Sequence, residues 1–379
     1  MKSKTTVLFI FIASIIFAQN HNKITLNVIS NSLNDSVNIF VAGNNKLLGD
    51  WNARRVSLNK INDSTWSRTF SFAKGQILEF KFTKGSWQSE ALTDNKEIPE
   101  NTVVKLNSDT VITKVIRFWK DELNPVNNFS GQITGTVKYF KQLKYDGILP
   151  RDVIVWLPPD YYKNTARHYP VLYMQDGQNI FDPATSSFGV DWQIDETADS
   201  LIRNGIITPL IIIGIYNTQD RNLDYSPGKK GTAYMKFLVN ILKPLIDKNF
   251  RTKPGRKYTA VGGSSMGGLI SFMLVWKYNS VFSKAICMSP ALKIDQFDYV
   301  KTIKADNSKR ENIFIYIDNG GVGLEERLQP GITDMLDALI NKGFAYNKNL
   351  FWVKDSTARH NEAAWAKRMA YPLKLFSGN

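Results

Sequence analysis

The sequence has very little cysteine and histidine. One cysteine and three histidines occur among its 379 residues. A structural zinc site or an iron–sulfur cluster needs several such side chains and a disulfide needs two cysteines, so all three are excluded. The single thiol, Cys287, lies in an apolar run that is typical of a strand. We expect it to be buried and structural rather than catalytic.

The N-terminus lacks an apolar run long enough to cross a membrane. The run Val7–Phe17 has about eleven residues, whereas a bilayer core of ~30 Å needs about 20. Lys2 and Lys4 precede this run and the small Ala18 follows it, which is typical of a cleaved secretory signal. We expect residues 1–18 to be a signal peptide and the mature protein to be secreted or periplasmic, without stable membrane insertion. The alternative is a buried strand or a short anchor.

Acidic residues are in the minority. The chain has 48 Lys and Arg and 34 Asp and Glu, a net charge of +14, which becomes +12 when Lys2 and Lys4 leave with the signal. The basic residues are scattered and their clusters are short, whereas a nucleic-acid-binding protein gathers them into a patch or stripe. We therefore expect no nucleic acid as a partner and favour an acidic surface or a polysaccharide.

Residues 19–119 show apolar segments with a period of two. Turns rich in Asn, Asp, Gly and Ser separate them, and the clearest are Asn38–Ala42, Thr65–Phe72, Ile77–Thr83 and Thr110–Val115. This spacing predicts the strands of a small all-β sandwich. A polar stretch follows at 120–130, and we expect a linker there.

Residues 131–379 have a different pattern, in which short apolar runs alternate with stretches of helical spacing. The expected strands are Val153–Leu157, Val171–Met174, Leu210–Ile215, Tyr258–Val261, Ala285–Met288, Ile313–Ile317 and Leu350–Val353. The expected helices are Tyr234–Asn249, Met266–Tyr278, Pro330–Lys342 and Glu362–Phe376. This alternation predicts an α/β fold, a mostly parallel sheet with helices on both faces.

The sharpest motif is Gly263-x-Ser265-x-Gly267, at the junction of an expected strand and an expected helix. The nucleophile of an α/β-hydrolase lies in such a position. Glycines flank the serine because a Cβ at either position would collide with the neighbouring strand or helix in so tight a turn. We expect Ser265 to be a nucleophile. The alternative is a glycine-rich turn without chemistry.

One histidine follows this serine. In α/β-hydrolases the order along the chain is serine, acid, histidine. His360 is the only histidine after Ser265, and it lies between the last expected strand and the last expected helix. His21 and His168 precede the serine. We expect His360 to be the general base.

The acid is expected in the loop after the strand Ile313–Ile317. This loop offers Asp318, Glu325 and Glu326. The acid fixes the tautomer of His360 and stabilises its charged form, so any carboxylate that reaches Nδ1 would serve. We prefer Glu325 and keep Asp318 as the alternative, because Asp318 lies at the very end of the strand, where it could brace the glycine-rich loop.

The oxyanion hole is expected to combine two backbone N–H groups. One belongs to Met266, the residue after the nucleophile, and the other to the loop after the strand Val171–Met174. This loop contains Gly177, which allows a close backbone approach. We assign the second donor to Gln178.

At these residues the sequence resembles the esterase D-like family of α/β-hydrolases, which includes enterochelin, feruloyl and acetylxylan esterases and mycolyltransferases. The motifs lie within residues 131–376 and are Val155-Trp-Leu-Pro-Pro-Asp-Tyr, Leu172-Tyr-Met-Gln-Asp-Gly-Gln-Asn-Ile-Phe-Asp, Asp224-Tyr-Ser-Pro, Gly262-Gly-Ser-Ser-Met-Gly-Gly, and His360 with Trp365. The resemblance implies an α/β-hydrolase fold. In relatives the acid commonly follows a glycine in an Ile-Asp-x-Gly loop, which supports Glu325, although the loop of this chain is longer.

The N-terminal domain is similar to the starch-binding type of carbohydrate-binding module. The matching motifs are Phe40-Val-Ala-Gly-Asn, Leu48-Gly-Asp-Trp-Asn, Trp66-Ser-Arg-Thr-Phe, Leu78-Glu-Phe-Lys-Phe-Thr-Lys-Gly and Gly85-Ser-Trp-Gln-Ser-Glu. The resemblance implies a sugar platform of Trp51 and Trp87 with Lys81 beside it, since flat indole faces stack on sugar rings. The alternative is that these tryptophans belong to the core, as we expect for Trp66.

Together these features predict a secreted serine carboxylic-ester hydrolase that works through an acyl-enzyme, without a metal or cofactor. The expected substrates are acetyl or feruloyl esters of polysaccharides or oligosaccharides, with a polysaccharide held by the N-terminal domain. A catecholate siderophore ester of the enterochelin type is the alternative within the same chemistry. A carbohydrate-binding protein without turnover is the alternative outside it.

Overall fold

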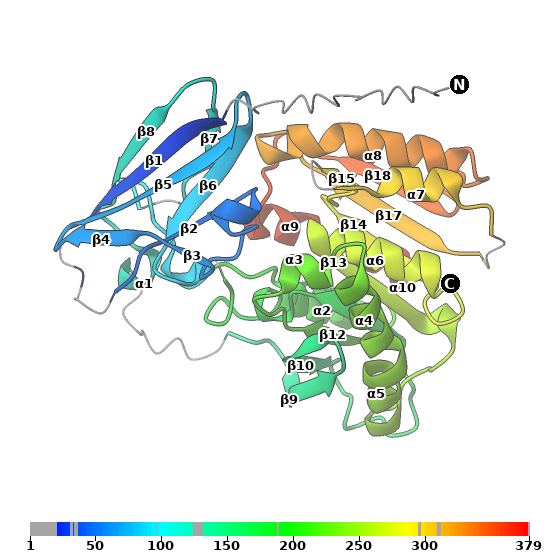
Figure 1. Ribbon diagram of the computed structural model, residues 1–379. Helices are drawn as coiled ribbons and strands as arrows, with labels where there is room; N and C mark the ends of the chain where they lie inside the picture. The colour runs from blue at the N-terminus through cyan, green and yellow to red at the C-terminus, as the bar shows by residue number, and fades with distance from the viewer. Residues whose placement is uncertain are drawn as a thin grey trace, which may run out of the picture. The chain divides into compact units, whose positions relative to one another are not determined.

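The computed structural model of the chain describes residues 21–30, 33, 37–96, 98–123, 132–187, 189–294, 297–308 and 312–377. The expected signal peptide at 1–18 lies outside the described residues. The chain divides into two compact units, residues 1–125 and 126–379 (Figure 1). None of the described helices is long and apolar enough to cross a membrane.

The first unit contains two four-stranded sheets, with strand orders β4-β5-β1-β8 and β3-β2-β6-β7. Neighbouring strands are antiparallel except β1 and β8, which are parallel. The strands are β1 (His21–Ile29), β2 (Phe40–Gly43), β3 (Val56–Ser57), β4 (Asn59–Asn62), β5 (Thr65–Ala73), β6 (Ile77–Thr83), β7 (Thr102–Lys105) and β8 (Thr110–Val115). Short helical turns are η1 (Lys46–Leu48), η2 (Trp87–Ser89) and α1 (Lys120–Leu123). Helix α1 takes the first four residues of the expected linker, whose remainder lies outside the described residues.

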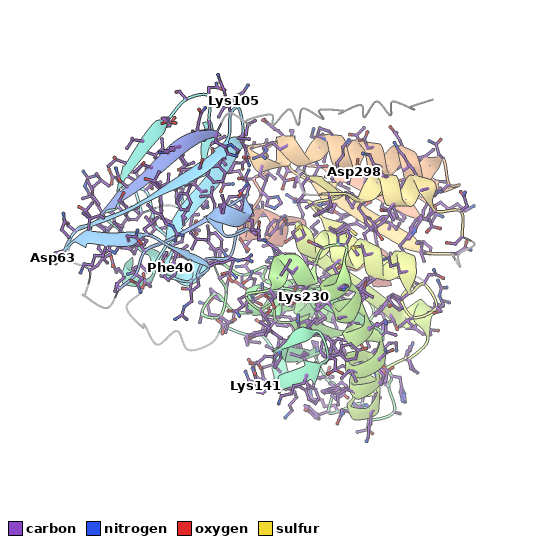
Figure 2. All side chains as sticks on the ribbon, viewed as in Figure 1. Phe40, Asp63, Lys105, Lys141, Lys230 and Asp298 are labelled. Atoms are coloured by element: carbon purple, nitrogen blue, oxygen red, sulfur yellow. The ribbon has the colours of Figure 1, made fainter. Side chains whose placement is uncertain are left out.

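Alternate side chains of these strands form one apolar core. On β1, Ile24, Leu26 and Val28 are fully buried, while the residues between them are half-buried. Trp66 and Trp119 are buried in the same core. Figure 2 shows the side chains of the unit drawn on its strands. The period of two in the sequence therefore follows from strands that have one face on a shared core.

The second unit is built on one eight-stranded sheet of order β18-β17-β14-β13-β11-β12-β10-β9. The six strands from β18 to β12 are parallel, and β10 and β9 are antiparallel to their neighbours. The strands are β9 (Thr136–Tyr145), β10 (Ile148–Leu157), β11 (Val171–Gln175), β12 (Ile211–Ile215), β13 (Thr259–Ser264), β14 (Lys284–Met288), β17 (Phe314–Asn319) and β18 (Leu350–Lys354). A separate two-stranded ribbon joins β15 (Lys293–Ile294) to β16 (Phe297–Asp298).

Helices cover both faces of this sheet. Val153 and Val155 of β10 belong to one core with buried residues of α4, α6 and α8, whereas Ile154 and Trp156 belong to the other with residues of α2, α9 and α10. The helices are α2 (Ile194–Arg203), α3 (Arg221–Asp224), α4 (Lys229–Phe237), α5 (Lys243–Asn249), α6 (Met266–Lys277), α7 (Tyr299–Ala305), α8 (Leu324–Ile340), α9 (Glu362–Arg368) and α10 (Ala370–Ser377). Cys287 is fully buried in the first core, as expected, and burial raises the pKa of its thiol.

Every expected strand and helix of this unit has a counterpart, with a few corrections. The expected helix Tyr234–Asn249 is two α-helices joined by a π-helical turn, η4 (Leu238–Leu242). Helix α8 starts at Leu324 rather than at Pro330, which lies inside the helix and costs one backbone hydrogen bond. Strand β9 was not expected because, at the edge of the sheet, it has no apolar run to signal it.

Candidate active site

Ser265 lies at the sharp turn between β13 and α6. Its backbone has φ 55° and ψ −121°, a region that residues other than glycine rarely adopt. Its N–H donates to the carbonyl of Met288 (2.9 Å), and its carbonyl accepts from the N–H of Ala291 (3.0 Å). These bonds hold the strained turn, and Ser265 is half-buried although the residues on either side of it are buried.

The glycines of this turn leave no room for a side chain. A Cβ on Gly263 would lie 2.8 Å from the carbonyl carbon of Gly267, which is closer than real Cβ contacts. A Cβ on Gly267 would lie 3.1 Å from the Cβ of Gln175, which is a tight contact. The steric reason expected for the two glycines is thereby confirmed.

His360 and Glu325 form a hydrogen-bonded pair. The Nδ1 atom of His360 is 3.0 Å from Oε1 of Glu325. The side chain of Glu325 is fully buried, and that of His360 is 12% exposed. The indole of Trp365 packs edge-on against the imidazole, with ring centroids 5.0 Å apart and planes at 83°. Because Nδ1 is engaged, Nε2 is the nitrogen that can exchange a proton with a substrate or nucleophile.

The carboxylate of Glu325 is held in its charged form. Burial acts to raise its pKa, but the hydrogen bond and charge of His360 act in the opposite direction. Hydrogen bonds from Ser289 and from the N–H of Gly320 (3.0 Å) add to this effect, and the pKa is lowered below its ordinary value. A charged carboxylate at this position can stabilise a protonated imidazole.

Asp318, the alternative acid, has a different partner. Its carboxylate accepts hydrogen bonds from Nε (3.0 Å) and Nη2 (3.2 Å) of Arg368 and from the hydroxyl of Tyr316 (2.9 Å). Its side chain is fully buried and that of Arg368 is 8% exposed. The geometry therefore favours Glu325 over Asp318 as the partner of His360.

The candidate triad lies along one edge of the sheet. Strands β13, β14, β17 and β18 are parallel neighbours, so their carboxyl ends share that edge. Ser265 follows β13, Ser289 follows β14, Glu325 comes in the helix after β17, and His360 in the loop after β18. The Ser289 hydroxyl accepts hydrogen bonds from Trp365 (3.1 Å) and from Arg368 (3.2 Å). Ser289 therefore contacts both Trp365, which packs on His360, and Arg368, which forms the buried ion pair with Asp318.

Sequence reasoning did not single out Ser289 or Arg368 as part of this site. Both are polar residues without a motif of their own, and their roles arise from contacts between segments far apart in the chain. Arg368 lies in the stretch of helical spacing Glu362–Phe376, in which nothing marks a buried basic residue. Its near-complete burial against Asp318 is visible only in the structure.

The two expected oxyanion donors lie on α6 and on η3 (Gly177–Asn179). Met266 is the first residue of α6, so its N–H has no carbonyl partner within the helix. Gln178 is buried in η3, directly after β11. The close approach that Gly177 allows is to the protein itself, because a Cβ there would lie 2.3 Å from the carbonyl carbon of Gly214 on β12. This contact fixes η3 against the sheet.

A charged cluster beside η3 escaped sequence reasoning. Asp176 accepts two hydrogen bonds from Arg221 (2.7 and 2.8 Å) and one from Asn217 (2.6 Å). Its Oδ2 lies close to the turn at Ser265, 3.2 Å from the position that a Cβ on Gly267 would take. The backbone of Asp176 has a left-handed conformation, with φ 57°. In a sequence, an Asp-Gly pair such as Asp176-Gly177 indicates a turn. The ion pair ties the start of η3 to the first residue of α3, and Asn217 adds a hydrogen bond from the segment before α3.

The expected sugar-binding residues of the first unit come from neighbouring segments. The N–H of Trp51 donates to the carbonyl of Gly43 at the end of β2 (2.8 Å), and β2 pairs with β6, which carries Lys81. Trp87 begins η2, just after β6. Trp51 and Trp87 are half-buried and lie outside the core, whereas Trp66 is fully buried in it, as expected.

Lys81, the polar group expected beside the platform, is part of an ion pair. Its Nζ is 2.7 Å from Oε1 of the fully buried Glu90, and its own side chain is 15% exposed. A sugar hydroxyl that contacts the ammonium group of Lys81 would share that group with the carboxylate of Glu90.

One group of side chains in the described part of the chain could hold a metal ion. It consists of Asp191, Asp195 and Glu196, around the start of α2. None of the candidate triad residues belongs to it.

Comparison with known proteins matches both units to families. Residues 149–374 match the Esterase family, described as "Putative esterase". Residues 21–113 match the starch binding domain family CBM_20. The two matches agree with the two resemblances stated from sequence motifs.

Each curated relative matches only about a third of this chain. The chain is 33% identical over 132 residues to an endo-1,4-beta-xylanase/feruloyl esterase of Xylanibacter ruminicola, a match that covers 34% of this chain and 18% of that protein. It is 29% identical over 147 residues to the uncharacterized protein YbbA of Bacillus subtilis, a match that covers 35% of this chain and 54% of that protein. The matches thus span only 18% and 54% of the length of these relatives.

Solved structures with a similar fold include a ferulic acid esterase and the enterobactin esterase of Shigella flexneri. The first has a TM-score of 0.54 at 19% identity and covers 65% of this chain and 98% of that one. The second has a TM-score of 0.53 at 12% identity and covers 89% and 88%. These likenesses confirm the α/β-hydrolase fold. Because the Esterase match spans more than half of the chain, the chain belongs to the Esterase family, and its first unit resembles a starch-binding domain.

Proposed function

We propose that the protein is a serine carboxylic-ester hydrolase. The observation that carries the proposal is the strained, half-buried Ser265 on the same sheet edge as the His360–Glu325 pair. A nucleophilic serine needs a base, and the base needs an orienting acid. Membership of the Esterase family supports the same chemistry.

In the first step, Oγ of Ser265 attacks the ester carbonyl while Nε2 of His360 takes its proton. Glu325 holds the Nδ1–H tautomer and stabilises the imidazolium that forms. The oxyanion of the tetrahedral intermediate is stabilised by the backbone N–H groups of Met266 and Gln178. His360 then gives its proton to the leaving alcohol, and an acyl-enzyme remains on the serine.

In the second step, water attacks the acyl-enzyme. His360 takes a proton from the water and returns one to Oγ of Ser265 as the carboxylic acid leaves. The same two N–H donors stabilise the second oxyanion. No step of this cycle calls for a metal or cofactor.

The substrates we propose are acetyl or feruloyl esters linked to polysaccharides or oligosaccharides. The match of residues 21–113 to a starch binding domain supports a polysaccharide partner. The likeness of part of the chain to a xylanase/feruloyl esterase supports a saccharide-linked ester. We further propose that the protein is exported, because Val7–Phe17 with its flanking lysines and Ala18 reads as a signal peptide.

A siderophore ester of the enterochelin type is the second candidate. It is supported by the likeness to the enterobactin esterase, which extends over 89% of this chain rather than over the esterase domain alone. The starch-binding match of the first unit argues for the polysaccharide ester instead.

A substrate panel tests these proposals. The full chain and its Ser265→Ala variant are assayed on feruloylated arabinoxylan, acetylated xylan, a catecholate siderophore ester and an activated acetyl ester. We expect hydrolysis of the activated ester and one polysaccharide ester, with none by the variant. Faster hydrolysis of the siderophore ester would favour the second candidate. A wild-type protein that cleaves none of the four and gives no acyl-enzyme burst would contradict an esterase.

A further inference from the structure

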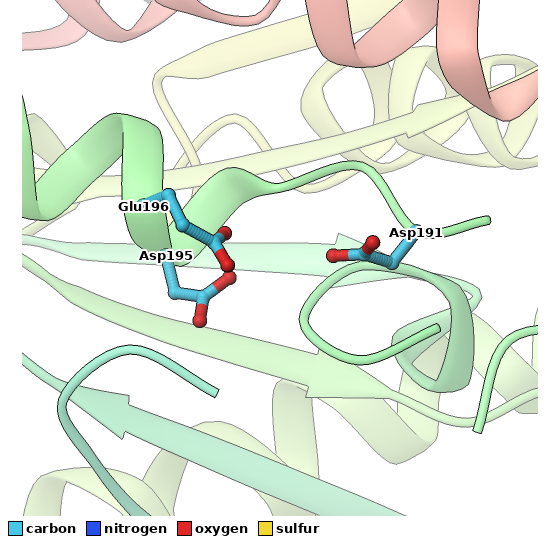
Figure 3. A group of neighbouring side chains, drawn as sticks. All are labelled: Asp191, Asp195 and Glu196. Atoms are coloured by element: carbon cyan, nitrogen blue, oxygen red, sulfur yellow. The ribbon is translucent and has the colours of Figure 1, made fainter. Parts of the chain in front are cut away.

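The loop before α2 and the first turn of that helix bring three carboxylates together. Asp191, Asp195 and Glu196 each have a carboxylate oxygen within 4.8 Å of the others. Asp191 is 5% exposed and Asp195 is fully buried. Figure 3 shows the carboxylates of Asp195 and Glu196 turned toward each other and that of Asp191 pointing in their direction. None of the three belongs to the candidate active site.

Two oxygens of this group face no N–H or hydroxyl donor. Oδ1 of Asp195 and Oε2 of Glu196 are buried and accept no hydrogen bond from such a group among the described residues. The other oxygen of Asp195 accepts from the backbone N–H of Thr134 (2.6 Å), and Oδ2 of Asp191 accepts from the N–H of Gln193 (3.0 Å). A buried carboxylate oxygen without a donor is costly, because burial removes its water and nothing replaces it.

No basic side chain compensates the charge of this group among the described residues. The charged groups that act on Asp191 are Glu196 and Asp182, and the one that acts on Asp195 is Glu196. All of these are acidic. Burial, then a hydrogen bond with Glu196 and its negative charge, raise the pKa of Asp195 to about 9, so that without a cation these two carboxyl groups share a proton. The N-terminus of α2 favours nearby negative charge but does not fill the two empty acceptor positions.

We propose that Asp191, Asp195 and Glu196 form a calcium site. All donors are oxygens, which selects a hard cation. Ca²⁺ binds oxygens at about 2.3–2.6 Å, so oxygens around one ion lie within roughly 5.2 Å of one another, as the ligand atoms of this group do. Mg²⁺ demands a near-ideal octahedron, which side chains from a loop and the first turn of a helix do not supply. Calcium also accepts the irregular geometry of a loop, with water completing its shell.

The bound cation would tie three segments together. Asp191 lies in the loop that follows η3, Asp195 and Glu196 begin α2, and Asp195 also holds the N–H of Thr134 near the start of the second unit. Ca²⁺ would stabilise the folded chain by binding it and not the unfolded chain. The site and its test do not depend on ester hydrolysis.

The test is calcium binding by the full chain. The protein is freed of metal with a chelating resin and titrated with CaCl₂, and separately with MgCl₂, by isothermal calorimetry, and its Tm is measured with Ca²⁺ or chelator. We expect one Ca²⁺ per chain, weaker binding of Mg²⁺, and a higher Tm with Ca²⁺. Glu196→Gln and Asp191→Asn should each weaken Ca²⁺ binding at least tenfold.

The matched control is Asp146→Asn. Asp146 is exposed in the turn between β9 and β10, so this change removes the same charge away from the site and should leave Ca²⁺ binding unchanged. Glu196 is only half-buried, and circular dichroism of its variant shows whether the fold is kept. The proposal is overturned if the wild type shows no binding at about 1 mM Ca²⁺, the upper range for extracellular sites. It is equally overturned if both site variants bind Ca²⁺ like the wild type, or if Mg²⁺ binds more tightly.

Discussion

The candidate acid–base pair of the second unit and the candidate platform tryptophans of the first unit lie in different environments. In the esterase domain, Glu325 is fully buried and His360 nearly so, and each is held by hydrogen bonds or ring contacts from several segments. In the first unit, which matches a starch-binding domain, Trp51 and Trp87 are half-buried on short turns beside the sheets.

The difference follows from what each task requires. Proton transfer needs donors and acceptors fixed to a fraction of an ångström, which burial and surrounding hydrogen bonds provide. Stacking on a sugar needs a flat apolar face that stays accessible. A catalytic site is therefore recognised by buried polar side chains, and a platform by aromatic side chains that remain partly exposed.

The largest expected effect separates catalysis from binding. Ser265→Ala should lower kcat by about 10⁶ while the fold stays intact, and His360→Ala should do much the same, as for serine hydrolases in general. Their combined loss should be far from additive because they act as one unit. Steady-state kinetics on an activated ester measures the loss, and retention on starch should be unchanged. More than a few per cent residual activity in Ser265→Ala would refute the mechanism.

The second prediction compares two buried acids within the esterase domain. Glu325→Gln should lower kcat by about 10⁴ because the tautomer of His360 is no longer fixed. Asp318→Asn should instead lower stability, by about 3–5 kcal/mol, because it leaves buried Arg368 without its charged partner. Kinetics and urea unfolding of both variants separate the two effects. A larger loss of turnover in Asp318→Asn would reassign the acid.

The third prediction contrasts tryptophans within the starch-binding domain. The double change Trp51→Ala, Trp87→Ala should abolish retention of the full chain on insoluble starch and leave both its fold and its hydrolysis of a soluble ester unchanged. Wild-type retention should persist at high salt, since stacking, unlike attraction to the net positive charge, is not screened.

Trp66→Ala serves as the contrasting variant. Trp66 is fully buried, so its truncation should destabilise the fold by about 3–5 kcal/mol. If the double variant unfolds to the same degree, the two platform residues are structural. If wild-type protein is not retained on starch or xylan at all, the first unit has no sugar platform of this kind.

The smallest expected effect is the pH dependence of stability that Glu325 contributes in the buried site. The pKa of Glu325 in the folded chain lies below its ordinary value of 4.5. Its charged form therefore stabilises the fold above that value, and the contribution disappears as the pH falls through the lowered pKa. The Tm difference between wild type and Glu325→Gln should be largest near neutral pH and shrink in acid. A difference that stays constant down to about pH 3 would mean that the carboxylate charge is irrelevant to stability.

Sequence reasoning predicted the fold and pointed to the residues of the candidate triad because their signals are local. Short segments of sequence contain these signals, namely the glycines on either side of Ser265, the apolar strand segments and His360. Strand β9 was missed because an edge strand needs no apolar run. Arg368, Ser289 and the Asp176–Arg221 pair were missed because their contacts join residues tens of positions apart, and no short window of sequence contains both partners.

The order of strands in the sheet has a consequence for how the enzyme is made. The edge strand β18, the loop with His360 and the helix with Arg368 come last in the chain, after Ser265 has already been translated. At about 5–20 residues per second, the ~100 residues from Ser265 to Arg368 take roughly 5–20 seconds to synthesise. During that interval Ser265 lacks the histidine proposed as its base. A nascent chain can thus complete its first unit before the proposed triad can assemble.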